Sequence, residues 1–123
     1  MHLSRAEFEG LVASALADIP PDFREKLDNV EIVVEDTPNP DGYGGPKTPP
    51  GVLLLGLYRG VPLTQRSVWA SKLFPDQITI FQRPIESICR THEEIVAQIR
   101  RTVLHEIAHH FGIPDQRLRE LGC

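Results

Sequence analysis

The segment that most constrains the fold of this chain is residues 91–111, a helical pattern that ends in the sequence H-E-x-x-H. Thr91 and Glu94 form a capping box, which opens a helix. Apolar residues then recur at the spacing of a buried helical face. His105 and His109 are four residues apart and flank that face, so their side chains share one side of the helix. The pattern predicts a helix that is anchored in the core and carries two histidines toward a cleft.

Two imidazoles at this spacing can bind one metal ion, and H-E-x-x-H on a helix is typical of a zinc site. Glu106 lies about 100° further around the helix, too far to be a comfortable third ligand. Its carboxylate is placed to hold a metal-bound water and act as a general base. The alternative is that His105, His109 and His110 are only partly exposed histidines at a helix C-terminus, where cations are favoured.

The residues after the motif supply a candidate for the third ligand. Gly112 is placed where a helix commonly ends on a glycine at positive φ, and Pro114 cannot continue the helix. Asp115 follows the resulting turn and can reach back to the metal. Two histidines and one carboxylate leave a position open for water, as in catalytic zinc sites. Asp115 has a second interpretation, as the N-cap of a last helix over residues 116–121.

Residues 105–115 resemble the extended H-E-x-x-H-x-x-G-x-x-H motif of metzincin proteases, with Asp115 where most members carry a third histidine. The chain length, the late motif and the sequence H-H-F-G are similar to a family of small bacterial zincin-like metallopeptidases, sometimes called minimal metzincins. The resemblance implies that His105, His109 and Asp115 bind Zn²⁺ and that Glu106 is the general base. The chain departs from metzincins in having no Met-turn, because its only methionine is Met1.

The expected reaction is hydrolysis of a peptide bond by metal-activated water. The resemblance also implies an extended substrate along an edge strand above the metal, and residues 77–81 are our candidate for that edge. Tyr43 and Tyr58 are candidates for stabilising the oxyanion, although a tyrosine is more often a packing or surface residue. Two alternatives remain open. One is a metal-dependent RNA hydrolase, and the other is a non-catalytic binding or regulatory module with a zincin fold.

The rest of the sequence predicts a single α+β domain over residues 1–123, with a small mixed sheet packed on helices. Ser4 and Glu7 form a capping box that opens a first helix, which Pro20 and Pro21 stop. The pattern further predicts one helical turn, three strands and two short helices. The turn is expected at 23–27, the strands at 30–34, 52–58 and 77–81, and the short helices at 84–89 and 116–121. The second strand is expected to be buried on both faces, and the third on one.

Composition narrows the class of protein and its setting. A hydrophobic fraction of 41% and a charged fraction of 24% are ordinary for a globular domain. The net charge of −4 has no basic cluster beside it, which argues against nucleic acid as a partner. No apolar run is long enough to span a membrane, and the N-terminus does not look like a signal peptide. Cys89 and Cys123 are expected to be free thiols in a reducing cytoplasm.

A long loop over residues 37–51 holds five prolines and four glycines. It is long enough to be functional and is the one segment that we expect to fold over the site as a lid. Only eight residues follow Asp115, which leaves little chain for the far wall of a cleft. We therefore expect weak activity on generic proteins, and either a narrow peptide substrate or a partner protein that completes the cleft.

Overall fold

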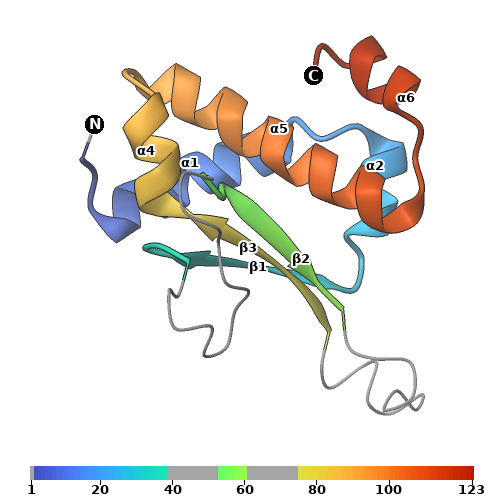
Figure 1. Ribbon diagram of the computed structural model, residues 1–123, viewed down its shortest axis with the longest axis horizontal. Helices are drawn as coiled ribbons and strands as arrows, with labels where there is room; N and C mark the ends of the chain where they lie inside the picture. Colours follow the sequence, from blue (N-terminus) through green and yellow to red (C-terminus); the bar gives the residue numbers. More distant parts are fainter. Residues whose placement is uncertain (1, 39–52, 61–74) are drawn as a thin grey trace.

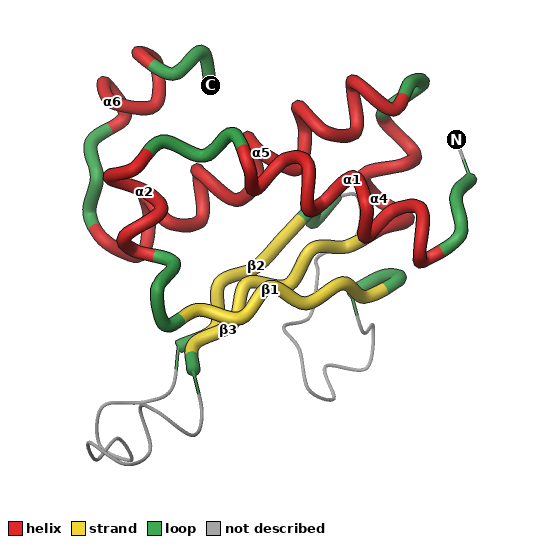
Figure 2. The backbone as a smooth tube through the Cα atoms, turned by 180° about the vertical axis from the view of Figure 1, so that it is seen from behind, coloured by secondary structure: helices red, strands yellow, loops and turns green. Residues whose placement is uncertain are grey.

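The computed structural model describes residues 2–38, 53–60 and 75–123, and these form a small sheet with helices on one side of it (Figure 1). The view from behind shows the same two layers (Figure 2). The elements in chain order are α1 (Arg5–Ala17), α2 (Pro21–Lys26), β1 (Val30–Glu35), β2 (Gly56–Arg59), β3 (Asp76–Phe81), α4 (Gln82–Ile88), α5 (His92–Phe111) and α6 (Asp115–Glu120). The fold is α+β, as the sequence predicts.

Both predicted capping boxes are present. The backbone N–H of Glu7 donates to Ser4 Oγ at 3.1 Å, and that of Glu94 donates to Thr91 Oγ1 at the same distance. In each case the glutamate also accepts from the backbone N–H of the cap residue. These bonds satisfy N–H groups that the first turn of a helix leaves without a partner. They fix where α1 and α5 begin.

The predicted short helix at 84–89 and the predicted helical turn at 23–27 both begin earlier in the structure than the sequence suggested. α4 starts at Gln82, two residues before Pro84, because a proline is tolerated throughout the first turn. α2 starts at Pro21, the first helical position, where the fixed φ of proline suits a helix. The first of the two consecutive prolines, Pro20, is its N-cap. The proline pair therefore separates α1 from α2.

The described sheet has the order β1-β3-β2, with β3 parallel to β1 and antiparallel to β2. The expectation that residues 77–81 form an edge strand is therefore wrong. The polar–apolar alternation there predicted one exposed face, but Thr79 is as buried as its apolar neighbours Ile78 and Ile80. A β-branched threonine packs well between two flanking strands, so its polarity gave a misleading signal.

The second strand is shorter and less buried than expected. β2 begins at Gly56 instead of residue 52, and the side chain of Leu53 is 52% exposed. The backbone of Leu55 still contacts the sheet, since its carbonyl accepts from the N–H of Phe81 at 2.9 Å. The apolar run over 52–58 indicated burial on both faces, but β2 is an edge strand of the described sheet and is only half-buried beyond Gly56. The predicted loop over residues 37–51, which includes Tyr43, lies almost wholly outside the described residues.

The core lies between the helices and the sheet. α1 and α5 pack against each other, α5 also contacts β2 and β3, and the buried faces of the two helices contribute most of the core. The largest fully buried side chains are Phe8, Phe23, Phe81, Ile78, Ile80, Ile85, Ile95, Ile99, Leu104, Ile107, Leu118 and Gln82. None of the helices in the described part of the chain combines the length and apolar character that crossing a bilayer requires.

Close approach of β2 to α5 depends on Gly56. A Cβ added there would lie 2.6 Å from Thr102 Cγ2 and 3.1 Å from the carbonyl oxygen of Thr79. Gly56→Ala should therefore lower the free energy of unfolding by about 1–3 kcal/mol, the usual cost of overpacking. Urea denaturation measures this change. Gly10→Ala is the matched control, because no heavy atom lies within 4 Å of a Cβ there. Equal stability of the two variants would contradict the tight contact.

Candidate metal centre

The H-E-x-x-H residues lie near the C-terminal end of α5, beside β2. The helix ends at Phe111, and Gly112 follows in the left-handed conformation with φ of 70°. The carbonyl of Ala108 accepts from the backbone N–H of Gly112 and from that of Ile113, the latter at 2.9 Å, and these bonds close the end of the helix. The predicted glycine stop is thus confirmed, and it turns the chain toward Asp115.

His105 and His109 share one side of α5. Their ring centroids are 6.2 Å apart, with planes inclined by 81°. Both line a hollow of about 320 Å³ between α5 and the start of β2. His105 is half-buried and His109 is exposed. The rings are close enough for side-chain rotation to bring one nitrogen of each onto a single ion, and nitrogen donors suit zinc. This pair therefore fits the metal that the motif predicts.

Glu106 lines the same hollow and is half-buried. Burial raises the pKa of its carboxyl above the usual value, because a charged carboxylate is poorly solvated there. The neighbouring His109 and a hydrogen bond from the backbone N–H of Tyr58 act in the opposite direction. A carboxylate with a raised pKa is a better proton acceptor near neutral pH, as a general base requires. The bond from Tyr58 also ties Glu106 to β2.

The raised pKa of Glu106 implies that the free energy of unfolding depends on pH. The folded chain holds this proton more tightly than the unfolded chain, whose carboxyl titrates near 4.5. Stability of the metal-free protein should therefore fall as pH rises from about 4.5 through the folded pKa. Glu106→Gln should remove this component, so the stability gained by the variant should grow with pH in that range. Urea denaturation of both proteins at a series of pH values measures the difference, and parallel curves would contradict the shift.

Asp115 is the first residue of α6 and is exposed. Pro114 occupies the N-cap and no side chain caps the helix, so the interpretation of Asp115 as N-cap is wrong. Among the described residues, no three His, Cys, Asp or Glu side chains gather into a possible metal site. The structure thus brings His105 and His109 together with Glu106 but does not bring Asp115 to them. α6 is held by its buried Leu118 and by an ion pair from Arg117 to Asp22 at 3.0 Å.

The side chain of Tyr58, a candidate for stabilising the oxyanion, instead contacts His110 and Asp76. Its ring stacks on His110 with centroids 3.8 Å apart and planes inclined by 16°. Its hydroxyl donates to Asp76 Oδ2 at 2.7 Å. The side chain thus packs β2 onto the end of α5, while the backbone N–H reaches Glu106. Sequence reasoning missed this contact, because no local pattern indicates which strand lies beside Glu106.

Arg101 was also missed, although the spacing that revealed the histidines applies to it. It lies one turn before His105 and lines the same hollow. Its Nη1 donates to Gln98 Oε1 at 3.2 Å, and Gln98 Nε2 donates to Thr102 Oγ1 at 3.2 Å. These three side chains form the wall of the hollow on the N-terminal side of the histidines.

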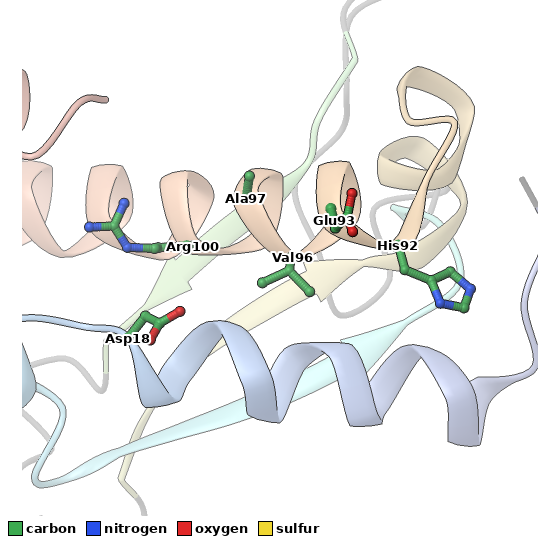
Figure 3. A pocket seen from close by; sticks show the side chains of 6 residues that line it. All are labelled: Asp18, His92, Glu93, Val96, Ala97 and Arg100. Atoms are coloured by element: carbon green, nitrogen blue, oxygen red, sulfur yellow. The ribbon is translucent and has the colours of Figure 1, made fainter.

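A larger hollow of about 660 Å³ lies elsewhere, between the end of α1 and the first half of α5 (Figure 3). Arg100 and Asp18 lie at one end of it and His92 at the other. It contains none of the H-E-x-x-H residues. Adjacent residues of α5, Arg100 and Arg101, therefore line different hollows.

Comparison with known proteins gives a family match and a structural match. The model of the family described as "Zincin-like metallopeptidase" matches residues 27–123. The solved structure of a conserved hypothetical protein from T. thermophilus matches with a TM-score of 0.57 and 24% sequence identity. The match covers 93% of this chain and 99% of that chain, and at this identity it shows a shared fold only. No curated protein matches the chain.

Proposed function

The chain belongs to the zincin-like metallopeptidase family, and from this membership we propose that it is a zinc-dependent peptidase with Glu106 as its general base. The observation that carries the proposal is the grouping of His105, Glu106 and His109 around one hollow beside β2. Two histidines offer metal donors, and the half-buried carboxylate with a raised pKa offers a proton acceptor. The family match covers most of the chain and includes the whole H-E-x-x-H motif.

The proposed mechanism assigns roles to five residues. His105 and His109 would hold the zinc, and Asp115 is the proposed third ligand. When bound, zinc lowers the pKa of a water molecule and polarises the scissile carbonyl. Glu106 accepts a proton from the attacking water and later delivers it to the leaving amine. The hydrogen bond from Tyr58 keeps the carboxylate of Glu106 oriented between the two transfers.

β2 replaces β3 as the proposed edge strand for the substrate. The carbonyl of Leu55 faces β3, whereas the N–H of Tyr58 faces Glu106. In an antiparallel pair, successive residues direct their backbone groups alternately toward the partner strand and away from it. The backbone N–H and carbonyl of Gly56 therefore point away from β3, on the side of the hollow. An extended peptide adding to this edge would pass the histidine pair.

The test is cleavage of a peptide mixture by the purified, zinc-loaded protein, with products identified by mass spectrometry. We expect cleavage at a subset of sequences, loss of cleavage when a chelator removes zinc, and recovery when zinc is restored. Single-stranded RNA is the parallel substrate. Cleavage of RNA and not of peptides would transfer the site to nucleic-acid hydrolysis, and turnover of neither would leave a binding module.

A further inference from the structure

Hydrogen bonds link the side chains of Gln98, Arg101 and Thr102, which form one wall of the hollow. Thr102 is buried against Gly56, and its hydroxyl accepts from the amide of Gln98. The same amide accepts from Arg101 through its oxygen. Gln98 therefore holds the guanidinium in a set direction on the exposed side of the wall. An ordered guanidinium loses less entropy when it binds a ligand than a free one does.

Charge in the hollow is unevenly placed. Among the described residues that line it, Arg101 is the one lysine or arginine and Glu106 the one carboxylate. Glu106 is engaged by the N–H of Tyr58, and no ion pair involves Arg101 within the described residues. The planar guanidinium can bind a carboxylate through two parallel N–H donors. The hollow thus offers an oriented cation one helical turn from the histidine pair.

We propose that Arg101 binds a carboxylate of the substrate and so gives the enzyme a preference for acidic peptides. The inference rests on the proposed function. The wall lies beside Leu55 and Gly56, so the carboxylate belongs to the part of the peptide that pairs with the beginning of β2. An Asp or Glu side chain and a free C-terminus carry the same group, and either would fit it.

The experiment measures binding by fluorescence anisotropy. The probes are labelled octapeptide pools with Glu at one scanned position and small or apolar residues elsewhere, and matched pools with Gln. Each pool is made with a free and with an amidated C-terminus. The protein is the zinc-loaded full chain carrying Glu106→Gln, which limits turnover. We expect the Glu pool, or the free C-terminus, to bind about fivefold more tightly, which is the upper end for an exposed ion pair.

Arg101→Gln in the same protein should abolish the preference, and Arg101→Lys should restore part of it. Arg100→Gln is the matched control, because Arg100 lines the other hollow (Figure 3) and its loss should leave the preference intact. A preference that survives Arg101→Gln, or equal or absent binding of all pools, overturns the inference.

Cleavage by the wild-type chain separates this inference from the function on which it rests. Cleavage of all pools at equal rates, whether they carry Glu or Gln and a free or an amidated C-terminus, would overturn the carboxylate site and leave the peptidase standing. An Arg101-dependent preference in binding with no cleavage by the wild type would support the carboxylate site and refute the peptidase.

Discussion

Glu106→Gln is expected to lower peptidase activity by at least about 10²-fold, the scale of losing general acid–base catalysis. Zinc content and fold should be unchanged. The amide is nearly isosteric with the carboxyl, and its oxygen can still accept the hydrogen bond from Tyr58. It has no basic site that could accept a proton from water at neutral pH. The measurements are kcat on the cleaved peptides, zinc per chain by elemental analysis, and circular dichroism.

Two outcomes would contradict the assignment of Glu106. A variant that cleaves peptides as fast as the wild type would reject its role as base. A folded variant that loses zinc would instead make Glu106 part of the metal site. Glu93→Gln is the matched control, since it makes the same change on the same helix within the other hollow, and it should leave activity unchanged.

His109→Ala is expected to abolish stoichiometric zinc binding. The side chain is exposed and faces the hollow, so its removal should cost little stability while it leaves His105 without its partner on the helix. Zinc per chain after dialysis measures the loss. His110→Ala is the control, because the ring of His110 stacks on Tyr58 and should not be a ligand. Full zinc content in the His109 variant would reject the predicted site.

Asp115→Ala tests the third ligand in the same assay. The Asp115 side chain makes no capping bond and is exposed, so the variant should fold with nearly wild-type stability. If Asp115 is a ligand, zinc affinity should fall although the two histidines remain. Unchanged affinity would show that another residue is the third donor. Asp115 would then lie apart from His105 and His109 in the zinc-loaded protein as well.

Features encoded by adjacent residues could be predicted from the sequence. The bounds of α5 follow from its capping box and from Gly112, and both lie within a few residues of the helix ends. The order of the strands could not be predicted, because polar–apolar alternation shows which side chains face the core and not which strands pair. Thr79 on β3 illustrates the limit, since its burial depends on strands far away in the sequence.

The candidate site likewise has features that could be predicted from the sequence and features that could not. His105, Glu106 and His109 form a local constellation on one helix, and the structure brings them to one hollow. The partner of Glu106 is the backbone of Tyr58, whose place depends on the pairing of β2. Asp115 depends on the course of the chain after Gly112, and a turn of the predicted kind still left it apart from the histidines.

The central place of β3 has a consequence for how the chain assembles. β1 and β2 do not pair with each other and share β3 as their partner, although both precede it in the chain. A ribosome therefore releases two strands before the segment that joins them exists. α5, which covers the sheet, follows later still. Pairings of such long sequence separation form slowly, and unpaired strands promote aggregation. The nascent chain should therefore be most prone to aggregation, and bind chaperones most, before residue 81 has emerged from the ribosome.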